Sequence, residues 1–337
     1  MKPQISIVIP TCNRKESLRR TLGSAALQLF PAMEVIVVDA SAEALDPEAL
    51  RIEFPQLNIR YCTSKPSVCI QRNIGIKLAN APYVFLCDDD IEMPPDYLSK
   101  IADYLSENDD AGIVTGLVLQ KNKTGEWEYQ YRPTSFLKFV WNYIFQLTVW
   151  GDFSLIKSNF VNASLINFIK KRYAKRGNGY TRAGWPLLTT FNSPVTRSSV
   201  YGLGAAVVKK EWLLASPFDE NLVPNGIGDN YGITANLPYD QPIHILTAAH
   251  VWHHCEPANR LKSITAYRYR IFALHYFMVN STRFSPMNIW FLYWSLYGNI
   301  LSQTFTLQLR LAATSFTTLI TLMAGQNPYM KKAVAIG

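Results

Sequence analysis

Residues 83–92, Tyr-Val-Phe-Leu-Cys-Asp-Asp-Asp-Ile-Glu, constrain the fold more than any other part of this sequence. The apolar first half is too short for a helix and is typical of a strand buried on both faces of a parallel sheet. Asp88, Asp89 and Asp90 follow it, at the sheet edge where open α/β folds bind ligands. Adjacent carboxylates repel one another, and Mg²⁺ and Mn²⁺ prefer carboxylate oxygen. The stretch therefore predicts a divalent metal site, although the prolines beyond it would also fit a solvated turn.

The first 120 residues alternate between strand and helix patterns. Four other apolar runs have the length of buried strands: 5–10, 34–39, 59–62 and 112–118. Helical spacing follows Asn13, which with Glu16 forms a capping pair, and follows Ser67. The alternation predicts an α/β fold with a Rossmann-like, mostly parallel central sheet and helices on both faces. No G-x-G-x-x-G follows the first strand, which argues against a dinucleotide-binding fold.

A second strand also ends in an acid, at Asp39. The carboxyl ends of parallel strands lie at one edge of the sheet. We therefore expect Asp39 and the Asp88–Asp90 cluster to line a common cleft that can hold a diphosphate.

Composition favours a folded protein with an anionic partner. Of 337 residues, 48% are apolar and 17% are charged, so a large core is expected and wholesale disorder is not. The formal charge of +8 suits a phosphorylated substrate or an anionic lipid surface, and no nucleic-acid recognition motif accompanies it. The five cysteines have no paired spacing, and the N-terminus passes directly into a strand. These features predict reduced cysteines, no signal peptide and a cytoplasmic protein.

Four short motifs, in this order and spacing, carry a family resemblance: Ile-Val-Ile-Pro-Thr-Cys-Asn-Arg at 7–14, Val-Ile-Val-Val-Asp-Ala-Ser at 35–41, Arg-Asn-Ile-Gly at 72–75 and Phe-Leu-Cys-Asp-Asp-Asp at 85–90. Residues 4–120 resemble the inverting family 2 glycosyltransferases, which have the A-type (GT-A) fold. The resemblance implies that Asp90, with Asp88, binds Mn²⁺ or Mg²⁺. It implies that Asp39 accepts a hydrogen bond from the nucleobase and that Arg72 contacts the base or a phosphate. It places four more residues at the donor nucleotide: Pro10, Thr11, Arg14 and Asp89.

The resemblance resumes after residue 201. Gly202-Leu203-Gly204 and Phe218-Asp219-Glu220 match elements that close the donor site from the acceptor side in such enzymes. The family then has a Glu-Asp pair whose aspartate is the catalytic base. This chain has Gly228-Asp229, so Asp229 is the implied base and Asp219 the alternative. His253, at the end of an apolar strand, is the implied third metal ligand.

The remaining segments have no such motifs. Residues 121–200 interleave aromatic and basic side chains, Tyr131 and Arg132 among them, which fits an acceptor lid or a structural insertion. In 261–337, 26 uncharged residues separate Arg283 from Arg310, and 20 more precede Lys331. We expect helices lying in a membrane interface, with Lys331 and Lys332 on an anionic leaflet. The residues expected toward the headgroups are Trp290, Tyr293, Leu296 and Tyr297. A soluble packing layer or a homo-oligomer contact is the alternative.

The sequence thus divides into four parts: the nucleotide-sugar half of a GT-A domain (1–120), the insertion (121–200), the acceptor-side half (201–260) and the C-terminal helices (261–337). The function we expect is transfer of a hexosyl or deoxyhexosyl unit from a nucleoside-diphosphate sugar to a hydroxyl of a glycan or lipid-linked acceptor. The protein would lie on the inner face of the cell membrane. A metal-dependent nucleotidyltransferase and a catalytically silent nucleotide-sugar-binding membrane protein are the rival hypotheses.

Overall fold

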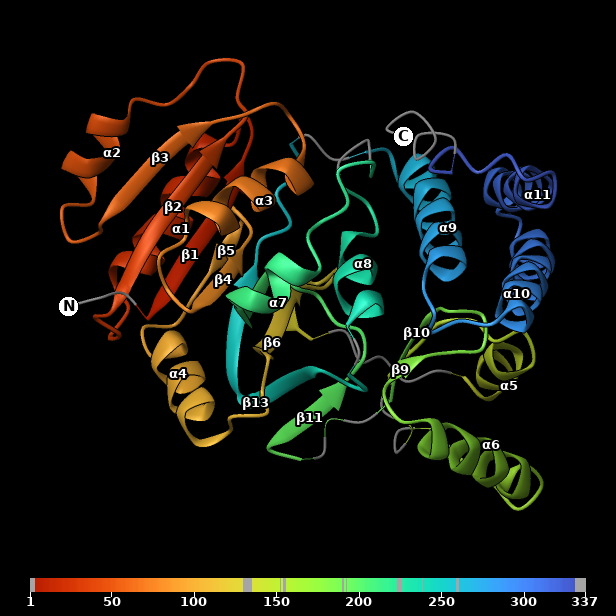
Figure 1. Ribbon diagram of the computed structural model, residues 1–337. Coiled ribbons are helices and arrows are strands. Elements are labelled where there is room, and N and C mark those ends of the chain that lie inside the picture. The colour runs from red at the N-terminus through yellow and green to blue at the C-terminus, as the bar shows by residue number, and fades with distance from the viewer. Residues whose placement is uncertain are drawn as a thin grey trace.

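The structure, a computed structural model, describes residues 4–330 apart from 130–134, 152, 154–155, 190, 192, 223–225, 238 and 259–260. The predictions for Tyr131, Arg132, Lys331 and Lys332 lie outside the described residues. Figure 1 shows a sheet with its helices on one side of the molecule and a layer of helices on the other.

A ten-stranded sheet forms the centre of the fold, with eight strands in the order β11-β13-β6-β12-β4-β1-β2-β3. Six of the eight run in one direction, and only β12 and β11 oppose them, which confirms the mostly parallel sheet. The short strands β5 and β7 pair with β13 and β6. The bounds are β1 (Ile5–Thr11), β2 (Met33–Asp39), β3 (Ile59–Thr63), β4 (Tyr83–Cys87), β5 (Ile91–Glu92), β6 (Ile113–Lys121), β7 (Trp127–Glu128), β11 (Val195–Ser198), β12 (Ala205–Lys209) and β13 (Ile243–His253).

Alternate side chains of the central strands enter two separate cores. Val8, Ile36 and Val84 are buried on one face of the sheet, and their neighbours Ile7 and Val35 on the other. This alternation explains why the strands are apolar throughout. The helices that accompany the sheet are α1 (Lys15–Ala26), α2 (Pro47–Glu53), α3 (Val68–Leu78), α4 (Tyr97–Glu107), α7 (Lys210–Ala215) and α8 (Asp229–Asn236).

The two predicted helix starts have different outcomes. Ser67 caps α3 as expected, because its hydroxyl accepts a hydrogen bond from the backbone N–H of Ile70. The prediction for Asn13 is wrong. Arg14 is the N-cap of α1, while Asn13 has a left-handed backbone (φ 53°) and its amide oxygen accepts from the N–H of Ala42. The loop after β1 is therefore tied to the loop after β2, which fixes the position of Arg14.

The insertion forms a small unit of α5 (Phe136–Ile144), α6 (Ala163–Arg176) and a three-stranded sheet of β8 (Val149–Trp150), β9 (Gly179–Tyr180) and β10 (Pro186–Leu188). The unit packs against the C-terminal helices. Trp185 donates its indole N–H to the hydroxyl of Ser295 at 2.8 Å, and Trp294 donates to the carbonyl of Ile144 at 2.9 Å. Sequence segments about 110 and 150 residues apart thus form one helical layer.

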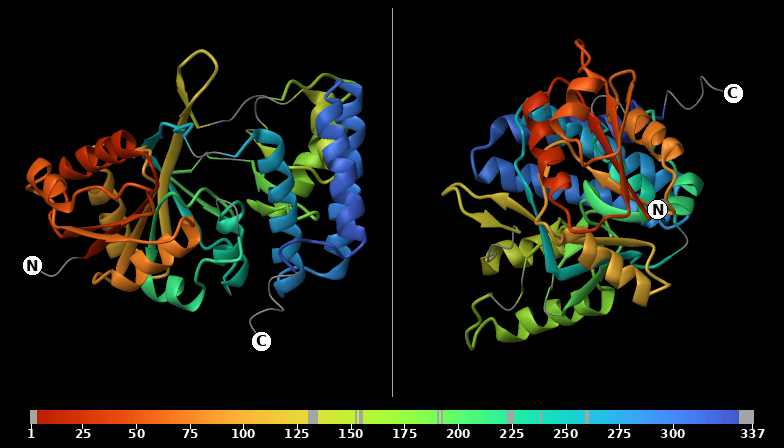
Figure 2. Two further views of the ribbon diagram at one scale, coloured as in Figure 1. Left: turned by 90° about the horizontal axis from the view of Figure 1, so that it is seen from above. Right: turned by 90° about the vertical axis from the view of Figure 1, so that its left-hand side faces the viewer.

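The C-terminal helices are α9 (Ser263–Asn280), α10 (Pro286–Phe305) and α11 (Leu309–Met323). In the left panel of Figure 2, α10 and α11 stand at the end of the molecule opposite β1–β3. All residues from 271 to 278 of α9 are buried, because α9 lies between the sheet side and α10 and α11. Within the described parts of the chain, we find no helix long and apolar enough to cross a bilayer.

The prediction that Leu296 faces the lipid headgroups is wrong. Leu296 is fully buried, because it shares the inner face of α10 with Leu292. Trp290 and Tyr297 are exposed, and Trp294, which we did not predict, is exposed beside them.

Candidate active site

A cleft of about 460 Å³ opens at the carboxyl ends of the parallel strands. Its walls come from the loops after β1 and β4, the first turns of α3 and α8, the end of β13, and α9. Nine of the ten predicted site residues line it: Pro10, Thr11, Arg14, Arg72, Asp88, Asp89, Asp90, Asp229 and His253. The fold thus brings together residues that lie up to 243 positions apart in the sequence.

Asp39 is the predicted residue that does not line the cleft. It pairs with Thr11 at the ends of β2 and β1, so it lies beside the cleft. Its carboxylate is 1% exposed and accepts hydrogen bonds from the hydroxyls of Ser41 and Tyr61, the latter at 2.7 Å. Asp39 therefore orders the loop next to the cleft, and its contact with a nucleobase stays a prediction.

Asp89 holds the loop after β1. Its carboxylate accepts from the Thr11 hydroxyl at 2.7 Å and from the Arg14 guanidinium at 3.0 Å. Burial raises the pKa of Asp89 to about 6, against the opposing effect of Arg14. Arg14 also donates to the carbonyl of Ala258 at 2.9 Å, so this one side chain joins the loops after β1, β4 and β13.

Asp90 and His253 converge in the cleft, with 3.2 Å between the Asp90 Oδ1 and the His253 Nε2. Burial lowers the pKa of His253, but the hydrogen bonds and charges of Asp90 and Cys255 together outweigh burial and raise the pKa to about 10. The His253 Nδ1 lies 2.9 Å from the Gln120 amide, which orients the ring. The Asp90 Oδ1 and the His253 Nε2 are atoms that can bind a divalent cation. Among the described residues, no cluster of three or more His, Cys, Asp or Glu side chains is suited to a metal. Mg²⁺ and Mn²⁺ sites typically complete such a partial set with phosphate oxygens.

Arg72 lies between two of the predicted acids. Its guanidinium pairs with Asp88 at 2.5 Å and with Asp229, and it stacks over the Phe218 ring at 5.0 Å. Burial raises the pKa of Asp229, and the charge of Arg72 opposes that rise. The buried Nε of Arg72 has no hydrogen-bond partner among the described residues. Arg72 therefore links the end of β4 to the start of α8, a role that the sequence did not predict.

Glycines hold both of these acids in place. A Cβ on Gly204 would lie 2.1 Å from the Asp88 Oδ2, so only glycine allows this carboxylate its position. Gly228 precedes Asp229 with φ at 93°, a left-handed conformation that strains other residues, and its Cβ would lie 2.5 Å from that of Ala273 on α9. The left-handed backbone and the close packing of α9 together explain why glycine stands at this position.

Residues 6–165 match the family model described as Glycosyl transferase family 2. This part, just under half of the chain, is therefore similar in sequence to the family 2 glycosyltransferases. A relative described as an uncharacterized glycosyltransferase, YwdF of Bacillus subtilis (strain 168), is 35% identical over 117 residues, which are 33% of this chain and 43% of the relative. The chain therefore spans less than half the length of that relative.

Solved structures confirm the GT-A fold. TarS 1-349 of S. aureus, in complex with UDP, matches 90% of this chain and 73% of its own at 16% identity, with a TM-score of 0.53. The mannosyltransferase PcManGT of Pyrobaculum calidifontis, in complex with GDP-Man and Mn²⁺, matches 99% of this chain and 79% of its own at 14% identity, with a TM-score of 0.52. These likenesses extend beyond residue 165 and show the fold.

Sequence reasoning missed several residues that line the cleft, Arg270 and Asn230 among them. Arg270 comes from α9, which has no family motif, and only the packing of α9 against Gly228 brings it to the glycosyltransferase domain. Asn230 follows Asp229, and its buried Oδ1 has no hydrogen-bond partner among the described residues. The predicted acceptor lid contributes nothing here, because none of the described residues from 121 to 200 lines the cleft. That role stays a prediction.

Proposed function

We propose that the chain is an inverting, metal-assisted glycosyltransferase that moves a sugar from a nucleoside-diphosphate sugar to a hydroxyl of a glycan or lipid-linked acceptor. The observation that carries the proposal is the content of one cleft. It contains a buried carboxylate at a helix start (Asp229), a carboxylate–imidazole pair (Asp90 and His253) and two arginines (Arg72 and Arg270). A general base, a cation site and diphosphate-binding charges are the groups that single-displacement glycosyl transfer requires.

Asp229 acts as the general base in this proposal. Its carboxylate takes the proton of the acceptor hydroxyl while that oxygen attacks the anomeric carbon from the face opposite the leaving group. The bond from the anomeric carbon to the diphosphate oxygen breaks, and its electron pair leaves with the nucleoside diphosphate. Burial raises the pKa of Asp229 and so makes it a better base, while the Arg72 charge keeps it ionised. Attack from the opposite face inverts the anomeric configuration.

The remaining cleft residues serve the donor. Thr11 and Arg14 lie at the end of β1, where Asp89 fixes both of them. A divalent cation held by Asp90 and His253 would neutralise the charge that develops on the diphosphate. Arg270, from α9, adds a positive charge to the same cleft, where it stabilises the departing group.

The acceptor is proposed from charge and from surface character. The net charge of +8 favours an acceptor with a phosphate, as lipid-linked sugars have. Helices α10 and α11, with Arg310 as their only charged residue, suit a protein at the inner face of the cell membrane.

The test combines donor binding with product analysis. Purified protein is titrated calorimetrically with a panel of UDP-, GDP- and dTDP-sugars, with Mn²⁺ and with a chelator. The bound donor is then incubated with glycan and lipid-linked acceptors, and the anomeric configuration of the product is read by NMR. We expect metal-dependent binding of one donor and an inverted product. A retained configuration would overturn the inverting mechanism.

The rival functions give different results in the same assay. Release of pyrophosphate from a nucleoside triphosphate would identify a nucleotidyltransferase. Donor binding without turnover on any acceptor would identify a silent binding protein.

A further inference from the structure

Helix α10 presents an apolar stripe to solvent. Five large apolar side chains on it are exposed, and they recur every three or four residues except for one eight-residue step. This spacing places them on one side of the helix. They are Met287, Trp290, Trp294, Tyr297 and Phe305.

The stripe continues through the turn into α11. Leu307 and Leu309 in the turn are 82% and 61% exposed, and Phe316, Ile320 and Met323 are exposed along α11. Leu307 has φ at 56°, where glycine or asparagine is the ordinary residue, so the chain keeps a large apolar side chain at a strained position. We call the ten exposed side chains of α10, the turn and α11 the hairpin face. Exposed apolar side chains along two helices that pack together indicate an interaction site.

We propose that the hairpin face docks the protein onto a bilayer that contains anionic lipids, with both helices in the plane of the interface. This inference deepens the proposed function, because it places the lipid-linked acceptor at the membrane surface beside the enzyme. Trp290 and Tyr297 on the stripe favour a lipid interface, where their rings are buried and their polar atoms stay hydrated.

The charge around the hairpin face selects anionic lipids. Helices α6 and α9 to α11 contain eight lysines and arginines and no aspartate or glutamate. Four of these cations, Lys171, Arg172, Lys175 and Arg176, are exposed on α6, which lies with α5, α10 and α11 on the side of the molecule away from β1–β3 (Figure 1). Each cation near an anionic leaflet strengthens binding.

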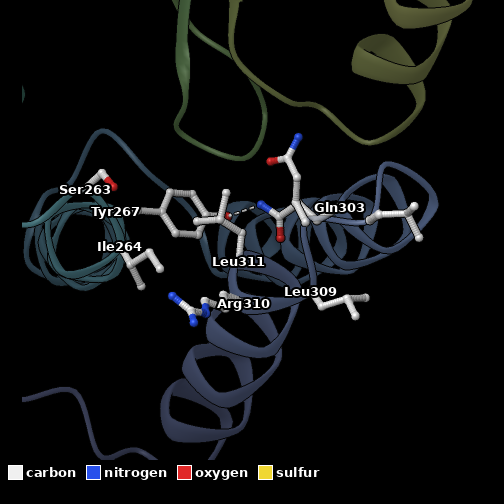
Figure 3. A pocket seen from close by; sticks show the side chains of 9 residues that line it. Ser263, Ile264, Tyr267, Gln303, Leu309, Arg310 and Leu311 are labelled. Carbon is white, nitrogen blue, oxygen red and sulfur yellow. Dashed lines mark hydrogen bonds between the residues drawn. The ribbon is translucent and has the colours of Figure 1, made fainter.

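A second pocket lies beside the turn that joins α10 and α11. It has a volume of about 660 Å³ and lies between α9 and the turn from α10 to α11. Figure 3 shows Tyr267 and Gln303 hydrogen-bonded to one another on one side of it and Arg310 on another. Arg310 is exposed and is the only charged residue between 284 and 330. An arginine among the leucines Leu309 and Leu311 suits a lipid phosphate with its acyl chain alongside.

The same charge argues against a second copy as the occupant. Two hairpin faces in contact would bring two regions without acidic residues together, and the like charges would repel one another. An anionic bilayer has the opposite charge and buries the same apolar side chains.

The test is sedimentation of the full chain with lipid vesicles. Vesicles of phosphatidylcholine alone are compared with vesicles that contain phosphatidylglycerol, at low and high salt. We expect binding to the anionic vesicles that weakens with salt. The double variant Leu307→Ser/Leu309→Ser should lower the partition coefficient by about tenfold or more, since each leucine loses its transfer from water. Arg310→Ala should lower it by about fivefold on anionic vesicles alone.

A matched control uses leucine and isoleucine side chains with similar exposure on the opposite end of the molecule. Leu29 and Ile52 are 71% and 80% exposed, and Leu29→Ser/Ile52→Ser should bind vesicles like the unchanged chain. Equal loss in both double variants, or no vesicle binding by a folded chain, would overturn the proposal. A dimer in light scattering that Leu307→Ser/Leu309→Ser abolishes would assign the face to a second copy instead. Because vesicle binding needs no turnover, the outcome is independent of the proposed glycosyl transfer.

Discussion

The parallel half of the sheet and the C-terminal helices both contribute residues to the cleft, but only the first does so through recognisable sequence motifs. Strands β1 to β4 with α1 and α3 form one end of the sheet, and the turns after β1, β2 and β4 each carry a recognisable motif. Helix α9 has no motif, yet it contributes Arg270 to the cleft and packs against Gly228, directly before Asp229. A segment without a family signature can therefore decide the geometry of the base.

The two regions also differ in what holds them. In the parallel half, apolar side chains on both faces of the sheet and a charged network around Asp89 fix the loops. At the start of α8, the proposed base is held by the ion pair with Arg72 and by a glycine that admits α9. The following predictions test this comparison, from the largest expected effect to the smallest.

Asp229→Asn should lower the turnover number by about 10²- to 10⁴-fold, since the acceptor hydroxyl loses its proton acceptor. Donor affinity by calorimetry should stay close to that of the unchanged chain. Asp219→Asn is the control, because Asp219 does not line the cleft and its carboxylate accepts from the N–H of Asn221 at 2.9 Å. If Asp219→Asn lost turnover and Asp229→Asn kept it, the base would be Asp219.

His253→Ala should weaken Mn²⁺-dependent donor binding by about 10- to 100-fold or more. Loss of a residue that only supports a metal ligand already weakens metal binding by about that factor. The measurement is a calorimetric titration of donor at several Mn²⁺ concentrations. His254→Ala is the matched control, because that ring lies 2.7 Å from Glu92 instead of in the cleft. Equal weakening in the two variants would contradict a metal role for His253.

Gly204→Ala should lower transfer by about tenfold, because displacement of a group that orients the site lowers the rate by up to about a hundredfold. The added Cβ would push the Asp88 carboxylate out of its ion pair with Arg72. Gly202→Ala is the control, since nothing lies within 4 Å of its Cβ and its backbone is not left-handed. Steady-state kinetics with both variants compares a residue in the charged network with its near neighbour.

Placing alanine in a left-handed backbone conformation costs about 1–2 kcal/mol. Gly228→Ala should lower the free energy of unfolding by more than this, because the new Cβ would also clash with Ala273. Gly125→Ala isolates the backbone part of this cost, since Gly125 has φ at 87° and open space around its Cβ. Urea denaturation of both variants measures the difference. If the two costs were the same, the contact with α9 would not be as close as the structure has it.

Much of the fold could be predicted, because the signals in it are local. The apolar runs ending in Asp39 and Asp88 define strands, and the parallel order brings their ends to one edge. The ion pair of Arg72 with Asp229 could not be predicted, because it joins residues 157 positions apart through the packing of α3, α8 and α9. Leu296 was misplaced for a related reason: an apolar helix without a clear polar face does not reveal which side is buried.

The sequence by itself determined the alternating strands and helices, the acids at their ends and the family that residues 6–165 resemble. It could do so because the hydrophobic period and the short motifs act over neighbouring residues. Only the tertiary structure decided that Asp39 is enclosed by its own loop, that Arg72 bridges two acids and that α9 forms part of the cleft. Those features depend on which surfaces pack together, and that choice follows from burial and close contact between distant segments.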